Sequence, residues 1–226
     1  DTIFFLLAGK MYAIFSILFG LSFFIQHDNQ AQKGIDFRPR FVWRMFLLML
    51  LGIFDLLFYN GDILFIYAVC GLLIIPLVRA SDKVIWIFIA LMLIQPVELI
   101  YLIKGIIDPS AMPMDLGSGK YYGAIMASQS QGNIIDVAVA GLKYGLPANF
   151  LWAVENGRMT QNVLFFLIGI MLGRKRLFYN EGNNLKTWKK ILIGSLIAFA
   201  VLLPLYKILP GLSEARCVSN SLSVAL

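Results

Sequence analysis

Long apolar stretches separated by short polar segments are the feature that most constrains this chain. A helix needs roughly 20 mostly apolar residues to span a bilayer, and several runs in the sequence approach that length. A soluble domain is nearer half apolar and a quarter charged, whereas 59% of these residues are hydrophobic and 14% are charged. We therefore predict an all-α, polytopic integral membrane bundle surrounded by the lipid bilayer.

Six spanning helices are expected in a single transmembrane domain that covers residues 1–226. They fall near residues 3–26, 41–59, 62–78, 84–103, 160–174 and 190–209. The chain opens at Asp1 without a Met and stops at Ser219–Leu226, a segment that could begin another helix. We therefore expect it to be a fragment of a longer protein.

Basic residues predict which way the bundle faces, because Lys and Arg favour short cytoplasmic loops. They cluster in 27–40, 79–83 and 173–190, whereas the turn Asn60-Gly61 carries no positive charge. The three basic loops are therefore predicted to be cytoplasmic, with 104–159 on the outer side. These loops account for the net charge of +6, so we expect no nucleic-acid partner.

One part of the outward region has the pattern of an amphipathic helix. Asp136, Ala140, Lys143 and Pro147 follow a spacing of four, three and four. This spacing puts polar groups on one face and apolar residues on the other. We expect a helix over Asn133–Leu146 that lies along the outer membrane surface.

Two acids flank the outward turn and are the candidate catalytic residues. Asp55 lies near the end of the second predicted span, and Asp62 begins the third. Two nearby carboxyl groups can share a proton and perform acid/base chemistry. The alternatives are a helix N-cap for Asp62 and a hydrogen bond to a neighbouring helix for Asp55.

Arginines supply the first candidate binding groups. Arg40 and Arg44 are four residues apart on one helix face and, with Arg38, could hold an anion such as a coenzyme A phosphate. The alternative is binding of lipid headgroups. Arg158 is a further candidate for substrate binding, with a surface ion pair to Glu155 as its alternative.

Glu98 is the remaining candidate for substrate binding. It follows Gln95-Pro96, where a proline can bend the helix and let the acid line a cavity. The alternative is a packing adjustment near the outer interface. Cys70 and Cys217 have no metal-site spacing, so we expect no metal, no disulfide and no resident cofactor.

Several strings together resemble one protein family. They are KMYAIFSILFG at 10–20, the basic-then-apolar start of Arg40–Gly52, GDIL at 61–64 followed by Tyr67-Ala68 and Gly71, and FLIGIMLGR at 166–174. They are similar to YeiB-like bacterial membrane proteins, whose C-terminal part is the domain of unknown function numbered 418. Members commonly have a His before the GDIL turn, where this chain has Asp55.

The resemblance implies a multi-pass protein of the bacterial inner membrane, distantly related to the transmembrane acyltransferases. An acyl-CoA held by Arg40 and Arg44 would then supply an acyl group to an outer-face acceptor, positioned or deprotonated by Asp55 or Asp62. The alternative is a small-solute transporter in which Asp55, Asp62 and Glu98 bind or couple. A structural subunit that needs a partner, including a second copy of itself, is a third option.

Overall fold

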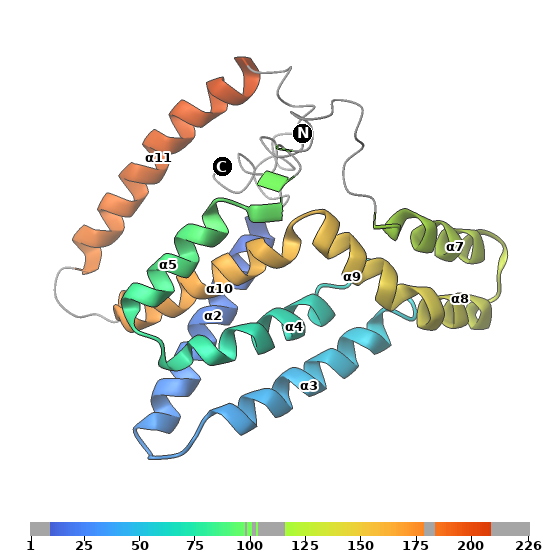
Figure 1. Cartoon of the computed structure of the whole chain (residues 1–226), viewed down its shortest axis with the longest axis horizontal. Coiled ribbons are helices and arrows are strands. Elements are labelled where there is room, and N and C mark those ends of the chain that lie inside the picture. Colours follow the sequence, from blue (N-terminus) through green and yellow to red (C-terminus); the bar gives the residue numbers. More distant parts are fainter. Residues whose placement is uncertain (1–9, 98, 101–102, 104–115, 179–183, 209–226) are drawn as a thin grey trace.

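The computed structural model describes residues 10–97, 99–100, 103, 116–178 and 184–208, and every regular element in these ranges is helical (Figure 1). The elements are α2 (Lys10–Ala31), α3 (Arg38–Asp55), α4 (Leu64–Ile74), η1 (Ile75–Arg79), α5 (Asp82–Leu93), α7 (Ser118–Gln131), α8 (Ile134–Ala140), η2 (Gly141–Gly145), α9 (Leu146–Glu155), α10 (Arg158–Arg174) and α11 (Asn184–Ile208). The predicted all-α class is confirmed.

Two helices that are distant in sequence, α2 and α10, pack together at the centre of the molecule (Figure 1). A Cβ atom added to Gly20 would collide with the backbone of Phe166, and one added to Gly169 would collide with the carbonyl of Ile17. The two helices run in the same direction, since Gly173 further along α10 meets Phe24. Such close backbone contact through small residues is typical of helix pairs in membranes.

The hairpin expected at Asn60-Gly61 is present between α3 and α4. Gly52 of α3 lies so close to α4 that a Cβ there would be 2.5 Å from the backbone nitrogen of Phe65. Further along, Gly71 of α4 packs on the Met45 sulfur of α3. The two helices therefore form an antiparallel pair fixed by small residues on both sides.

The helix predicted over Asn133–Leu146 is present and continues further than expected. α8 begins with a capping box between Asn133 and Asp136, and η2 and α9 extend the helical run to Glu155. The π-type turn η2 lies just before Pro147, which has no N–H to donate and so disturbs the preceding hydrogen bonds.

Two helical stretches of the described residues, Met11–Ala31 and Ile134–Glu155, are long and apolar enough to cross a membrane. A third, Leu64–Arg79, is apolar but shorter. The second stretch belongs to the region assigned above to the outer surface, and its length and composition would also let it span. The six predicted spans are therefore matched only in part by this criterion.

The predicted span 84–103 is interrupted, because α5 ends at Leu93. Gln95 has a φ of 53°, in the left-handed region that non-glycine residues rarely adopt. A following proline disfavours the helical conformation of the residue before it, and Pro96 stands there. The break is thus a kink of the kind that the sequence suggested, but Glu98 lies outside the described residues.

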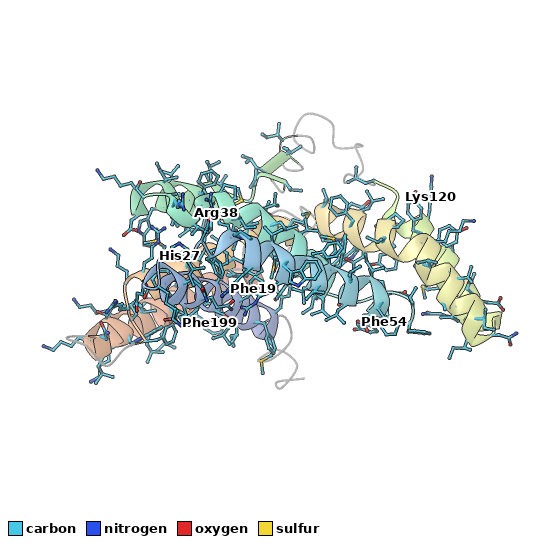
Figure 2. The ribbon with its side chains drawn as sticks, turned by 90° about the horizontal axis from the view of Figure 1, so that it is seen from below. Phe19, His27, Arg38, Phe54, Lys120 and Phe199 are labelled. Atoms are coloured by element: carbon cyan, nitrogen blue, oxygen red, sulfur yellow. The ribbon has the colours of Figure 1, made fainter. Side chains whose placement is uncertain are left out.

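Several helices present apolar side chains outward, where no other described element covers them. Phe54 of α3 is 64% exposed, Trp86 of α5 is 54% exposed and Ile197 of α11 is 60% exposed. Figure 2 labels Phe54 near the end of α3, and α11 stands apart from the other helices in Figure 1. Soluble monomers rarely expose apolar surface on this scale, and together with the two long apolar helices these faces indicate association with a membrane.

Candidate functional site

A cavity of about 450 Å³ opens where α4 and α10 begin. We call this the pocket end of the molecule. The lining residues are Tyr12, Asn60, Gly61, Asp62, Ile63, Ile66, Tyr122, Asn149, Trp152 and Arg158. Ligand pockets are commonly a few hundred Å³ and largely apolar, with a few polar groups that fix orientation, and this cavity has that character.

Arg158 is the cationic side chain of this lining. It is the first residue of α10 and follows Gly157, whose φ of 61° suits glycine. Its guanidinium carbon lies 5.2 Å from the centre of the Tyr12 ring and 5.9 Å from the centre of the Trp152 ring, within the range of cation–π attraction. One nitrogen donates to Gln161 Oε1 at 3.1 Å.

No carboxylate among the described residues forms an ion pair with Arg158. A guanidinium has five N–H donors, so donors beyond the one that bonds Gln161 remain for a ligand. The start of α10 also carries the partial positive charge of a helix N-terminus. The charge of this corner of the cavity therefore favours an anion.

Asp62 lines the same cavity, but its carboxylate already has partners. Its two oxygens accept the backbone N–H groups of Leu64 at 2.9 Å and Phe65 at 3.1 Å. These are the otherwise unpaired amides of the first turn of α4, so Asp62 performs the capping role that was one of its two expected readings.

Asp55, the second predicted catalytic acid, is half-buried at the end of α3 and is not among the residues that line the cavity. The structure therefore brings Asp62 and Arg158 to one site and leaves Asp55 outside it.

Asn149 contributes the most deeply buried amide of the lining. It lies on α9, is 2% exposed, and its Nδ2 donates to the backbone carbonyl of Asp62 at 2.8 Å. Its Oδ1 is buried and has no hydrogen-bond partner in the part of the chain that the structure describes. Such an unsatisfied buried acceptor is uncommon in proteins and calls for an explanation.

A buried polar cluster lies between α2, α4 and α10, next to the cavity. The Ser16 hydroxyl is within hydrogen-bond distance of the Tyr67 hydroxyl at 2.8 Å and of Asn162 Oδ1 at 2.9 Å. Tyr12, which lines the cavity, donates from its hydroxyl to the backbone carbonyl of Arg158 at 3.3 Å. The cluster joins three helices and holds the Tyr12 wall in place.

Glu155 is buried. The alternative of a surface ion pair between Glu155 and Arg158 is therefore wrong in placing Glu155 at the surface. Its carboxylate accepts the backbone N–H of Leu116 at 2.6 Å and hydrogen bonds from the backbone and hydroxyl of Ser118. These bonds attach the start of α7 to the end of α9 and so place Tyr122 in the pocket wall.

Arg40 and Arg44 lie toward the other end of α3, about 23 Å and about 17 Å along the helix from Asp55, at 1.5 Å per residue over 15 and 11 residues. Arg40 donates to Gln30 Oε1 at 3.2 Å, and Arg44 contacts Gln26. Both arginines contact side chains near the end of α2, so they share the helix face that their spacing predicted, and neither lines the cavity that Arg158 lines.

A second set of contacts joins the basic loops at this end, which we call the basic end (residues 27–40, 78–83 and 174–178). Arg174 donates to the carbonyls of Val78 at 2.9 Å and Ala80 at 2.8 Å, and to Asp82 Oδ1 at 2.7 Å. The Arg174 hydrogen bond lowers the pKa of the Asp82 carboxyl. Arg174 therefore closes the end of η1 and the start of α5 onto α10.

The loop between α2 and α3 lies close to the same group. Hydrogen bonds from Arg38 lower the pKa of Asp36 to about 2, and the charge of Arg79 acts in the same direction. Arg38 is near one end of α3 in Figure 2, and Phe54 is near the other. All three basic loops that the sequence predicted on one side of the membrane thus meet at one end of the molecule.

Four of the residues that build the pocket end were not identified from the sequence: Tyr12, Asn149, Trp152 and Asn162. The available signal was that an Asn within an apolar helix is costly in a membrane unless it is paired or functional. Asn149 and Asn162 meet that description, although neither side chain is ionisable.

Comparisons with known proteins give similarity without an assigned activity. The chain is 32% identical over 82 residues to an uncharacterised 39.9 kDa protein in the amylase 3' region of Bacillus acidopullulyticus. This match covers 36% of the present chain and 24% of that protein. It is also 24% identical over 217 residues to the uncharacterised protein YxaH of Bacillus subtilis. This second match covers 87% of the present chain and 51% of YxaH. The chain thus spans about a quarter and about half of these relatives. No protein-family model and no solved structure matches it.

Proposed function

We propose that this chain is part of a multi-pass protein of the bacterial cytoplasmic membrane, with its basic end toward the cytoplasm and its pocket end toward the outside. The gathering of three Lys/Arg-containing loops at one end supports this orientation, because such loops are retained in the cytoplasm. The apolar outer faces of α3, α5 and α11 support contact with lipid.

In this proposal, the pocket binds a small anionic amphiphile, with the anionic group at Arg158 and the apolar part against Ile63 and Ile66. The observation that carries this proposal is the environment of the Arg158 side chain. This cation lies within cation–π range of two aromatic rings, beside mainly apolar walls, and no acid of the described chain forms an ion pair with it. A cation in a low-dielectric site attracts an anion more strongly than an exposed one does.

The test uses the full-length protein in an uncharged detergent. Dodecyl phosphate is titrated in, and thermal stability is followed for the wild type, Arg158→Gln and Arg40→Gln, which removes an arginine from the basic end. We expect dodecyl phosphate to stabilise the wild type and Arg40→Gln saturably, with similar apparent affinity. In Arg158→Gln the apparent affinity should be about tenfold weaker, as for loss of a charge-assisted hydrogen bond. Equal weakening in both variants, or no saturable effect in the wild type, would contradict pocket binding.

Acyl transfer is a second candidate, favoured by the position of Arg40 and Arg44 side by side at the far end of α3 from the pocket. A cytoplasmic acyl-CoA would bind there, and an acceptor would occupy the pocket. Transfer forms a C–O or C–N bond between the acyl carbon and the acceptor and breaks the C–S bond of the thioester. A base takes the proton of the acceptor, and the CoA leaves as a thiolate that takes up a proton to become the free thiol. Asp62 is the candidate base that borders the cavity.

Titration of acetyl-CoA and longer acyl-CoAs tests this candidate in the same stability assay. Stabilisation that is lost in Arg40→Ala/Arg44→Ala and kept in Asp62→Asn supports a cytoplasmic donor site. If no acyl-CoA stabilises the protein, acyl transfer is contradicted. Uptake measurements in proteoliposomes would then test small-solute transport.

A further inference from the structure

We infer that the ligand of the pocket is a phospholipid whose head group carries a free hydroxyl next to its anionic phosphate, and that Asn149 recognises this hydroxyl. The inference rests on the proposed function, because it takes the anionic site at Arg158 as given and specifies what lies beside it. Its basis is the buried amide of Asn149, which the packing of the protein leaves half satisfied.

The orientation of the Asn149 amide is fixed by its partner. A backbone carbonyl can only accept a hydrogen bond, so the group that lies 2.8 Å from the Asp62 carbonyl must be the NH₂ of Asn149. The other end of the amide is therefore the oxygen, which can only accept. A ligand that satisfies it must bring an O–H or N–H donor.

The same helix places Asn149 beside the anionic site. Asn149 and Trp152 are three residues apart on α9 and so share a helix face, and the Trp152 ring contacts the Arg158 guanidinium. All three side chains line one cavity. The ligand must therefore present its anion and its donor close together in a single head group.

The charges of the site favour a hydroxyl over an ammonium group as the donor. Arg158 would repel a second cation placed beside it, and the Asp62 carboxylate is already held at the start of α4 by two backbone amides. A neutral hydroxyl is not repelled by Arg158 and needs no carboxylate to balance its charge. The apolar walls and the apolar outer faces of neighbouring helices favour a lipid over a free hydroxylated phosphate.

The test compares two lipids with the same phosphodiester charge, of which only one has hydroxyl groups in its head group. Phosphatidylglycerol has a phosphodiester charge and glycerol hydroxyls, and phosphatidylmethanol has the same charge without a hydroxyl. Each is used to displace a fluorescent phosphatidylglycerol from the full-length protein in uncharged detergent, and free glycerol phosphate is the soluble arm. We expect phosphatidylglycerol to displace the probe at roughly fivefold lower concentration than phosphatidylmethanol, as for one hydrogen bond, and glycerol phosphate not to displace it over the same range.

Variants then assign the preference to its residue. Asn149→Leu removes the acceptor at similar size and should abolish the preference while phosphatidylmethanol still binds. Arg158→Gln should weaken both lipids, and Ser195→Ala, an exposed position on α11, should change neither. The comparison of lipids on the wild type needs no variant and so stands even if Asn149→Leu does not fold.

The outcomes separate this inference from the function on which it rests. Equal displacement by the two lipids, with both weakened in Arg158→Gln, overturns the role of Asn149 and leaves the anionic pocket intact. Displacement by glycerol phosphate as effective as by phosphatidylglycerol overturns the assignment to a lipid. If neither lipid depends on Arg158, the proposed pocket function fails and the inference fails with it.

Discussion

The basic end and the pocket end of this bundle use arginine in opposite ways. At the basic end, Arg174 satisfies two backbone carbonyls and Asp82, and Arg38 pairs with Asp36. At the pocket end, Arg158 lies against aromatic rings with no ion pair among the described residues. The difference teaches that Arg174 holds helix ends together and Arg38 pairs locally with Asp36, whereas the charge of Arg158 is available to a ligand.

The two ends are joined by α2 and α10, which reach from the pocket to the basic loops. If the contact between α2 and α10 holds the two ends together, disturbing it should reduce stability more than any other change proposed below. Gly20→Leu is expected to lower the free energy of unfolding by about 3 kcal/mol or more, because the new side chain would collide with backbone of Phe166 that cannot move aside as a side chain can.

The matched control for this variant is Gly194→Leu on α11, where a Cβ meets nothing within 4 Å. Both variants are measured by unfolding in the same detergent. Equal stability of Gly20→Leu and Gly194→Leu would mean that the α2–α10 contact does not support the bundle, and the description of two linked ends would have to be abandoned.

The structural role of Arg174 is tested by comparison with Arg38, a basic-end arginine whose ion pair is exposed. Arg174→Gln should cost about 2 kcal/mol, because it removes charge-assisted hydrogen bonds and leaves carbonyls of Val78 and Ala80 unpaired. Arg38→Gln should cost clearly less than Arg174→Gln, because exposed ion pairs contribute little to stability. A larger loss for Arg38→Gln would reverse the assignment of roles at this end.

At the pocket end, two substitutions of Asp62 distinguish capping from chemistry. Asp62→Ala should destabilise the protein by about 1 kcal/mol through loss of the N-cap of α4. Asp62→Asn should be nearly neutral for stability, because Asn caps helices about as well as Asp does. Thermal unfolding of the two variants checks this, and an equal loss in both would show that the negative charge matters more than the cap.

The smallest expected effect is a dependence of stability on pH at the basic end. The pKa of Asp82 is held below its ordinary value of 3.8 by Arg174, so its ionised form is favoured in the folded protein. This contribution is present above the ordinary pKa and is lost as the pH falls through the folded pKa. The melting temperature of the wild type should therefore fall below about pH 4 more steeply than that of Asp82→Asn.

Asp28→Asn is the control for that measurement, since Asp28 lies in the same region and forms no ion pair among the described residues. It should show the acid dependence of the wild type. If the melting temperatures of the wild type and Asp82→Asn fall equally with pH, the ionised Asp82 does not contribute to stability at the basic end.

The sequence was a good guide wherever the governing interaction is local. The turn at Asn60-Gly61, the cap at Asp62 and the shared face of Arg40 and Arg44 follow from neighbouring residues, and each is present. The kink at Pro96 was also anticipated, although its form, with Gln95 in a left-handed conformation, was not.

Long-range packing explains what the sequence did not reveal. Tyr12 and Arg158 are 146 residues apart, and nothing in either segment indicates that they meet. Glu155 and Arg158 are three residues apart and invited the idea of a surface ion pair, yet tertiary packing buries Glu155 against Ser118. Local spacing could not predict this, because the competing partner comes from another helix.

By itself, the sequence determined an all-helical chain with its basic loops on one side, since apolar runs, prolines and charges act through local conformation and through preference for water or lipid. Only the tertiary structure decided which polar groups are satisfied by the protein and which are left over. It occupies Asp62 and Arg174 with backbone partners, places Arg158 and Asn149 in the lining of one cavity, and leaves the Asn149 oxygen without a partner among the described residues. The physical reason is that a hydrogen bond depends on where both partners are, and these partners come from helices far apart in the chain.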